Sequence, residues 1–202
     1  RISELILSRG LDIVWACPNG VRIDTLDREL LQLMRRSGCY MLGLGIETAN
    51  QELSDAVGKK LDLSCLEEKV HLMKEMGIDA YGFFLLGLPG ETQQTAEETI
   101  DLACRLPFAQ VHFSHLVPLP GSRIFNDWVA ERELDSIPWE HFDSKVKTLW
   151  RTEALGPDDI MRLRRKAWQR FYMRPKPFFR MISKIRPRQI PYIAQRLLTG
   201  RV

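Results

Sequence analysis

The sequence predicts an α/β fold of about four parallel strands with helices, followed by an α-helical C-terminal extension. Between residues 11 and 118, short apolar runs alternate with amphipathic segments at a spacing of about 30 to 38 residues, the length of a βαβ unit. After Pro118 this alternation stops, and prolines divide the remaining chain into helical pieces. With 202 residues, 45% of them hydrophobic and 27% charged, the chain is able to bury an ordinary globular core.

The strands are expected at four apolar runs, each rich in β-branched, aromatic or aliphatic side chains and each closed by a turn signal. These runs are residues 11–17, 40–48, 78–87 and 110–117. Parallel strands that are joined through helices have right-handed crossovers, so the helices should cover one face of a curved sheet.

Helices are expected between the strands, because apolar residues recur there at helical spacing behind start signals. The first helix covers residues 2–8, and the helix after the first strand follows Asp24. Two capping boxes, Ser64 to Glu67 and Thr95 to Glu98, mark the next two helix starts.

The ends of helices are marked as well. Gly38 and Gly77 are expected to end the helices that precede the second and third strands, since glycine adopts the left-handed conformation found there. In the C-terminal extension, residues 124–133 are expected to be helical. A further helix should begin at Gly156-Pro157-Asp158.

Charge is distributed unevenly along the chain. Residues 157–202, the basic tail, carry 13 Lys and Arg against 2 Asp and Glu, a net charge of +11, which leaves −8 for residues 1–156. Aromatic residues lie among the arginines of this tail, a pattern that fits nucleic-acid binding and also an amphipathic segment at a membrane surface. We favour intramolecular docking of the basic tail on the acidic body, ahead of membrane or partner contact and, last, nucleic acid.

The four cysteines, at positions 17, 39, 65 and 104, form neither a CxxC pair nor a zinc-binding pattern. We expect them to be small buried side chains rather than ligands. No apolar stretch approaches the roughly 20 residues of a membrane span, and the charged first residues are unlike a signal peptide. A cytoplasmic protein is therefore expected.

The candidate site lies where the loops at the carboxyl ends of the strands converge, because ligands bind there in parallel α/β folds. In the second expected strand, alternation places the aliphatic residues on one face and Gly43, Gly45 and Glu47 on the other. Two positions without side chains leave room for a flat ligand whose hydroxyl or amino groups would donate to Glu47. A bend and a solvated glutamate are the structural alternative.

Two histidines lie on the fourth expected strand. His112 and His115 are three residues apart, so they face opposite sides and cannot bind one metal ion together. One of them is a candidate to line the site and touch substrate, and the alternative is a hydrogen-bonded core histidine.

Five motifs follow one another along the chain: WACPNGVRID at 15–24, GIETAN at 45–50, GFFLLGLPGET at 82–92, VPLPGS at 117–122, and GPDDIMRL at 156–163 with RFYMRP at 170–175. The first four resemble the third to sixth strand ends of the radical S-adenosylmethionine (radical SAM) enzymes. The last resembles the tail of the subgroup that carries an upstream cobalamin-binding domain. Each motif is weak alone, but five in this order are specific.

The resemblance implies a partial TIM-like (β/α)6 barrel, of which residues 1–135 are the C-terminal part, and a basic helical extension at 136–202. It also implies S-adenosylmethionine (SAM) and a 4Fe-4S cluster as cofactors, which together generate a 5′-deoxyadenosyl radical, and a small-molecule substrate. Cobalamin, bound by an upstream domain, would be a further cofactor.

This sequence departs from the family in two ways. The cluster thiolates, spaced CxxxCxxC, are absent, and so is the glycine-rich second strand end that receives the methionine amino group. We expect both to lie upstream of Arg1. The chain would then be an inactive fragment, and its open sheet edges would favour self-association.

Three of the eight candidate cofactor-binding residues would contact polar groups. The resemblance assigns Glu47 and Thr48 to the ribose or methionine part of SAM, and Arg22 is a candidate for a carboxylate of cofactor or substrate. Glu91 and Thr92 are expected to start a helix rather than touch the ligand, because carboxylates favour the positive end of the helix dipole.

The other five candidates would surround the adenine. The resemblance places Leu85, Gly87 and Leu88 beside the ring, together with the backbone near Val117 and Leu119. It assigns no catalytic residue and no metal ligand within this chain.

Two other functions stay open from the residues alone. An ordinary TIM-barrel lyase or hydrolase would use Glu47 and a histidine as acid and base and would need no upstream cysteines. A non-catalytic module would bind nucleic acid or membrane through the basic tail, with a steep dependence on salt.

Overall fold

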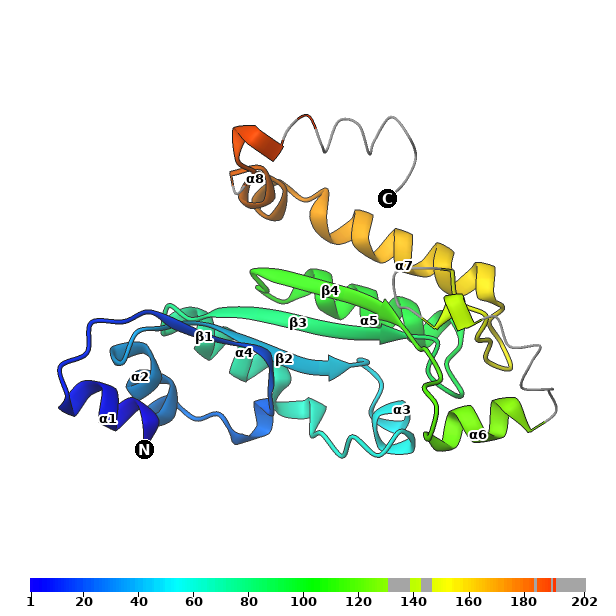
Figure 1. Ribbon diagram of the computed structural model, residues 1–202, viewed down its shortest axis with the longest axis horizontal. Coiled ribbons are helices and arrows are strands. Elements are labelled where there is room, and N and C mark those ends of the chain that lie inside the picture. Colours follow the sequence, from blue (N-terminus) through cyan, green and yellow to red (C-terminus); the bar gives the residue numbers. More distant parts are fainter. Residues whose placement is uncertain (131–138, 143–146, 184, 190, 192–202) are drawn as a thin grey trace.

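The computed structural model describes residues 1–130, 139–142, 147–183, 185–189 and 191. At its centre is a four-stranded parallel sheet in the order β1-β2-β3-β4, so each strand pairs with its neighbour in the sequence. The strands are β1 (Trp15–Val21), β2 (Cys39–Glu47), β3 (Asp79–Leu86) and β4 (Gln110–His115) (Figure 1). The predicted α/β class with four parallel strands is confirmed.

Helices connect the strands and continue beyond them. The helices up to the last strand are α1 (Ile2–Ser8), α2 (Arg28–Arg36), α3 (Gln51–Ala56), α4 (Leu66–Glu75) and α5 (Gln93–Arg105). After β4 come α6 (Arg123–Val129), α7 (Pro157–Tyr172) and α8 (Pro175–Ser183). Short 3₁₀ turns are η1 (Ile23–Thr25), η2 (Leu63–Cys65), η4 (Trp139–His141) and η5 (Pro187–Gln189). The end of the helix expected at 124–133 lies outside the described residues.

The sheet has one covered face and one open face. Every second residue of β3 is buried, and the residues between them, Tyr81, Phe83 and Leu85, are only half-buried. Helices α4 and α5 contact β3, and α7 lies along β4 and contacts α5 (Figure 1). The fully buried side chains of Leu42, Leu44, Ile46, Phe84 and Leu86 form the sheet's part of the core.

The hydrogen bonds at the helix starts involve other residues than the sequence patterns predicted. Asp27 rather than Asp24 caps α2, because its carboxylate accepts from the Leu30 N–H at 2.7 Å. The box expected at Thr95 to Glu98 lies one turn earlier, where Thr92 caps α5 and exchanges hydrogen bonds with Thr95.

The box expected at Ser64 to Glu67 is wrong. Asp62 accepts from the Ser64 N–H at 2.9 Å and starts the turn η2, which leads directly into α4. Gly38 and Gly77 follow α2 and α4 with φ of +95° and +70°, so the two glycine helix ends are confirmed.

The first strand begins later than expected. It covers Trp15–Val21 instead of residues 11–17, and its pairing with β2 shifts register between Cys17 and Val21. Pro18 lies in this interval and has no N–H for the ladder, which an edge strand tolerates. Residues 18–21, which follow the expected strand, therefore belong to β1.

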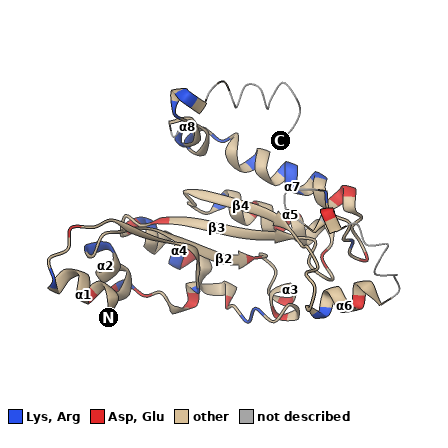
Figure 2. Cartoon of the chain, in the orientation of Figure 1, with Lys and Arg blue, Asp and Glu red and all other residues tan. Residues whose placement is uncertain are grey.

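The first part of the basic tail docks on the sheet. In α7, Ile160, Leu163, Ala167 and Phe171 are buried in the core. Ion pairs join this helix to α5, from Lys166 to Glu97 at 2.5 Å and from Arg170 to Asp101 at 2.7 Å. The expected docking of a basic tail on an acidic body is thus confirmed for α7, on which Figure 2 marks the Lys and Arg positions in blue.

Side chains of α7 also occupy the outer edge of β4. The Tyr172 hydroxyl donates to the Val111 carbonyl at 2.7 Å and accepts from the Val111 N–H at 3.2 Å. Farther along the strand, the Arg164 guanidinium donates to the Phe113 carbonyl at 3.1 Å. Backbone groups that would otherwise be free at the sheet edge are therefore hydrogen-bonded.

The Phe171→Ala variant should lower the free energy of unfolding by about 3 to 5 kcal/mol, because it removes a fully buried ring from the contact between α7 and the sheet. Trp168→Ala is the matched control on the same helix. Its ring is 47% exposed, so a loss of only about 1 kcal/mol is expected. Urea unfolding followed by circular dichroism measures both, and equal losses would show that α7 is not part of the cooperative core.

Candidate functional site

A pocket of about 510 Å³ opens on the uncovered face of the sheet, toward the carboxyl ends of the strands. Its lining, here called the strand-end pocket, comprises residues 19–22, Gly45, Glu47, Lys59, Leu61, residues 83–85, His112 and Ser114. The pocket therefore lies at the end of the sheet where parallel α/β folds bind ligands.

Strand register brings the pocket residues together. Gly45 of β2 lies opposite Phe83 of β3, and Phe83 lies opposite His112 of β4. One step farther along, Leu85 lies opposite Ser114. Because side chains alternate between the two faces of a strand, these residues form two rows across the open face.

Glu47 ends β2 in an unusual backbone conformation. Its φ is +69°, and the pairing of β2 with β3 shifts register between Gly45 and Glu47. A non-glycine residue in the left-handed region is energetically unfavourable, so the surrounding structure must hold it there. The next residue, Thr48, supplies hydrogen bonds that do so, since its hydroxyl accepts from the Asn50 N–H at 3.1 Å and pairs with the Thr99 hydroxyl at 3.3 Å.

The Glu47 carboxylate forms an ion pair with Lys59. The two charged groups are 2.7 Å apart, and the side chains are 25% and 32% exposed, so solvent reaches the pair from the pocket. A half-exposed pair of this kind contributes little to stability, and either partner is able to exchange it for a ligand group.

Arg22 holds the loop that carries Lys59. Its guanidinium donates to both carboxylate oxygens of Asp24, at 3.1 and 2.6 Å, and to the carbonyls of Lys59 and Lys60, at 3.4 and 3.1 Å. The hydrogen bonds from Arg22 lower the pKa of the Asp24 carboxyl. Arg22 thus lines the pocket while most of its donors are already used.

The two strand glycines have different surroundings. A Cβ at Gly43 would lie 2.6 Å from the Pro18 carbonyl oxygen and 2.8 Å from the Phe83 ring, so protein atoms fill the space expected for a flat ligand. A Cβ at Gly45 would lie 3.0 Å from the Lys59 ammonium. The absence of a side chain at Gly45 therefore leaves room for the ion pair between Glu47 and Lys59 at the floor of the pocket.

The turn after β3 is closed by a buried carboxylate. Glu91 is fully buried and accepts from the Gly87 N–H at 2.5 Å, and its other carboxylate oxygen has no partner within the described residues. Burial raises the pKa of Glu91 to about 7. The expectation that Glu91 starts a helix is wrong, because α5 begins at Gln93 behind the capping residue Thr92.

Residues 150–152, which precede α7, form hydrogen bonds to this turn. The Trp150 indole N–H donates to the Gly87 carbonyl at 2.6 Å, and the Thr152 hydroxyl donates to the Glu91 carbonyl at 3.0 Å. Residues 87–91 are therefore held on both sides, by their own carboxylate and by the C-terminal extension.

The structure brings three of the eight predicted cofactor-binding residues into the strand-end pocket, namely Arg22, Glu47 and Leu85. The other five lie outside its lining. Thr48 and Leu88 are fully buried, and Gly87 lies in the turn at residues 87–91. Val117 lines a small neighbouring cavity, and Leu119 is 58% exposed. The roles of all eight residues in cofactor binding stay predictions.

Sequence reasoning missed Lys59, Phe83 and Ser114. Alternation along the third and fourth strands was sufficient to find Phe83 and Ser114. Lys59 has no such signal, since it lies on a loop whose position depends on Arg22.

The histidines face opposite sides, as expected. His112 lies in the strand-end pocket, where burial and the nearby Arg164 guanidinium lower its pKa, so the ring is neutral at pH 7. His115 is buried on the covered side, with its Nδ1 3.4 Å from the Arg164 guanidinium.

The cysteines lie on four separate elements: Cys17 in β1, Cys39 in β2, Cys65 in η2 and Cys104 in α5. Only Cys39 is buried, which corrects the expectation for the other three, and burial raises the pKa of its thiol to about 11. Within the described residues, no three His, Cys, Asp or Glu side chains gather in a metal-binding group.

Residues 2–103 match the sequence profile of the radical SAM superfamily. A protein of Pyrococcus horikoshii named as an uncharacterized methyltransferase is 30% identical over 175 residues, which are 87% of this chain and 38% of that protein. The chain belongs to the radical SAM superfamily. Membership confirms the expected family and, with it, SAM and a 4Fe-4S cluster as the family's cofactors.

Two further proteins are similar to this chain. The anaerobic magnesium-protoporphyrin IX monomethyl ester cyclase of Rubrivivax gelatinosus is 26% identical over 170 residues, 84% of this chain and 30% of that protein. Coproporphyrinogen III oxidase of Escherichia coli, a radical SAM enzyme, superposes with a TM-score of 0.58 at 17% identity, over 85% of this chain and 36% of that structure. That likeness supports the partial barrel fold. The chain therefore spans well under half the length of each relative.

Replacing Glu91 with Gln should change how stability depends on pH. The folded-state pKa is about 7 and the unfolded value about 4.5, so the folded protein binds this proton more tightly and loses stability as pH rises from 4.5 to 7. Relative to the native chain, Glu91→Gln should gain about 2.5 kcal/mol between pH 5 and pH 8.

Thermal melts at the two pH values measure this difference. Glu75→Gln is the control, because its hydrogen bonds from Arg28 at the surface lower the pKa of Glu75 and place its titration below this range. A pH dependence unchanged by Glu91→Gln would show that the Glu91 carboxyl is ionised in the folded state at ordinary pH.

Proposed function

We propose that this chain holds the nucleoside part of SAM in a radical SAM enzyme, with Glu47 accepting hydrogen bonds from ribose hydroxyls. The supporting observation is the position of the Glu47 carboxylate: it ends β2 in the strand-end pocket, within reach of solvent and beside Lys59. A carboxylate is able to accept two hydroxyl donors at once, which suits a vicinal diol.

The size of the pocket and the chemical types of its side chains suit SAM. A volume of about 510 Å³ is within the usual range of small-ligand sites, and one wall is apolar and the other charged. Phe83 and Leu85 offer a surface for a flat purine, whereas Glu47 and Lys59 offer one acceptor and one donor for the sugar and the amino-acid part.

The residues of this chain do not fit the iron–sulfur cluster. A cluster needs several thiolates close together, and the described cysteines lie on separate elements. We therefore assign the cluster ligands to another part of the whole protein.

The pocket residues have distinct roles in this proposal. Glu47 and Lys59 bind and orient SAM, and Arg22 acts through the loop that it holds. Phe83 and Leu85 exclude water from one side of the bound nucleoside. His112 is neutral at pH 7 and so offers a donor and an acceptor without adding charge. SAM, when bound, supplies the reactive group that the superfamily's chemistry uses.

The whole protein is proposed to be a methyltransferase or cyclase that acts on a small molecule. The methyltransferase of Pyrococcus horikoshii and the cyclase of Rubrivivax gelatinosus support this class. The GPDDIMRL and RFYMRP motifs favour cobalamin as an additional cofactor, held by another domain. Tetrapyrroles and lipids are the substrate classes that we consider first.

Replacing Glu47 with Gln should weaken SAM binding by about tenfold to a hundredfold, because hydrogen bonds to a charged acceptor are worth about 1.5 to 3 kcal/mol. The melting temperature should stay within a few degrees, since Glu47 forms only a half-exposed ion pair. Isothermal titration calorimetry of the full-length protein with SAM measures the affinity.

Glu75→Gln serves as the control for this experiment, because Glu75 forms a surface ion pair with Arg28 on another part of the chain. It should leave SAM affinity unchanged. Unaltered binding by Glu47→Gln, or unfolding of that variant, would contradict the assignment of Glu47 as a ligand residue.

Anaerobic reconstitution of the 202-residue chain with iron and sulfide should yield no site-bound 4Fe-4S cluster. The reason is the separation of the four cysteines over β1, β2, η2 and α5. Iron and sulfide analysis after desalting, with the visible absorption spectrum, tests this. A stoichiometric cluster that cleaves SAM would refute the assignment of the ligands to another part of the protein.

A further inference from the structure

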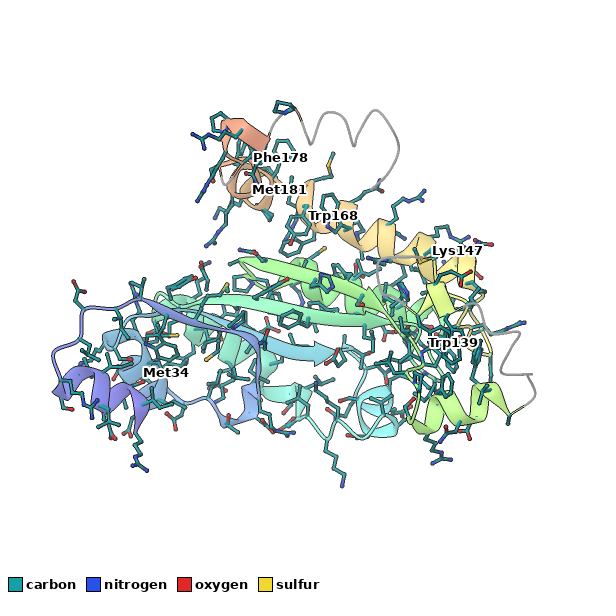
Figure 3. All side chains as sticks on the ribbon, viewed as in Figure 1. Met34, Trp139, Lys147, Trp168, Phe178 and Met181 are labelled. Carbon is teal, nitrogen blue, oxygen red and sulfur yellow. The ribbon has the colours of Figure 1, made fainter. Side chains whose placement is uncertain are left out.

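Docking on the sheet accounts for α7 but not for α8. Four side chains of α7 are buried, whereas no residue of α8 is. Phe179 is 68% exposed, Ile182 is 45% exposed, and Met173, between the two helices, is 70% exposed. Phe178 and Met181, which Figure 3 labels on α8, are half-buried.

The exposed residues of α8 are arranged by type. Pro175, Phe179 and Ile182 follow the spacing i, i+4 and i+7, so they lie along one side of the helix. Lys176 and Arg180 are each one position farther on, so they form a cationic row beside this apolar row. Such a helix has an apolar edge directly bordered by positive charge.

No acidic residue follows Asp159 in the sequence, whereas 13 Lys and Arg do. Part of this charge is compensated within the molecule, since Lys166, Arg170 and Arg180 pair with acidic residues of the body. Lys176 has no ion-pair partner among the described residues, and Figure 2 marks basic positions on both α7 and α8.

A groove of about 680 Å³ runs between α8 and the amino-terminal ends of β3 and β4. Its walls include the apolar side chains of Ile78, Leu106 and Phe108. Its rim carries Lys74, Arg174 and the cations of α8, together with Asp79, which pairs with Arg180. In an anionic amphiphile the hydrocarbon part suits the apolar groove, and the charged headgroup suits its cationic rim.

We propose that Met173, Phe179 and Ile182, with Lys176 and the cationic rim of the groove, form a docking surface for an anionic phospholipid membrane. The apolar side chains enter the boundary between headgroups and acyl chains, and the cations contact the phosphates above it. Lys and Arg suit this position because their long stems let the charge reach the headgroups.

The chemistry favours a membrane surface over the alternatives. A nucleic-acid surface needs cations and stacking rings, and the aliphatic side chains of Met173 and Ile182 add nothing to it. A second copy of the chain that met this surface symmetrically would bring the same positive charge against it. None of the described helices has the length and hydropathy of a membrane span.

Cosedimentation of the full-length protein with vesicles tests the proposal. Vesicles of phosphatidylcholine containing about one third phosphatidylglycerol should bind the protein, and pure phosphatidylcholine should bind it at least about tenfold less tightly. Raising the salt concentration should weaken binding to the anionic vesicles, because exposed charges are screened.

Two variants separate the apolar and the charged contributions. The double variant Phe179→Ser, Ile182→Ser and the variant Lys176→Glu should each weaken binding to the anionic vesicles by on the order of tenfold. Their matched controls are Ile2→Ser and Arg36→Glu, which alter equally exposed positions on α1 and α2 and should bind as the native protein does. Circular dichroism checks that each variant is folded.

Several outcomes would overturn the proposal. Equal binding to neutral and anionic vesicles, or unchanged binding by both tail variants, would refute a role for this surface. Binding of a single-stranded oligonucleotide in place of vesicles, lost in Lys176→Glu, would assign the surface to nucleic acid. Self-association that disappears in the Phe179→Ser, Ile182→Ser variant, without vesicle binding, would assign it to a second copy of the chain.

Discussion

Burial of one face of the sheet determines where the remaining features of this molecule lie. The aliphatic residues of β2 and alternate residues of β3 and β4 pack against helices, so the residues between them must face the other side. Gly45, Phe83 and His112 therefore share one row across the open face. A slip of one residue in any strand would bury polar groups and expose aliphatic ones, and this fixes the register on which the strand-end pocket depends.

Local sequence patterns predicted most of the fold, because the spacing of apolar residues reflects which face of each strand and helix is buried. Alternating and helical periodicities located the four strands and most of the helices to within a few residues but missed α3, and the charge imbalance predicted the docking of α7. The first strand was misplaced because residues 11–14, at its expected start, do not pair with β2, while residues 18–21, which begin with the turn-like sequence Pro-Asn-Gly, continue the strand. Edge strands often give weak sequence signals, since neighbours cover less of them.

The candidate site was predicted less completely, because several of its contacts join residues far apart in sequence. Strand alternation and the family resemblance both identified Glu47, but nothing in the sequence connects it to Lys59, 12 residues away. Likewise Glu91 precedes a helix and resembles an ordinary N-terminal acidic residue, although the turn folds back and buries it against Gly87. Trp150, 63 residues from Gly87, reaches that turn only through the path of the C-terminal extension.

The hydrogen bonds from Tyr172 and Arg164 to the backbone of β4 obstruct the addition of a further strand at that edge of the sheet. A new strand at β4 would first have to displace both side chains, and with them the packing of α7 in the core. At the opposite margin, β1 has no strand beyond it in the described part of the chain. Strands supplied by another segment or another molecule can therefore join only beside β1, so closure of a barrel around the open face must proceed from that side.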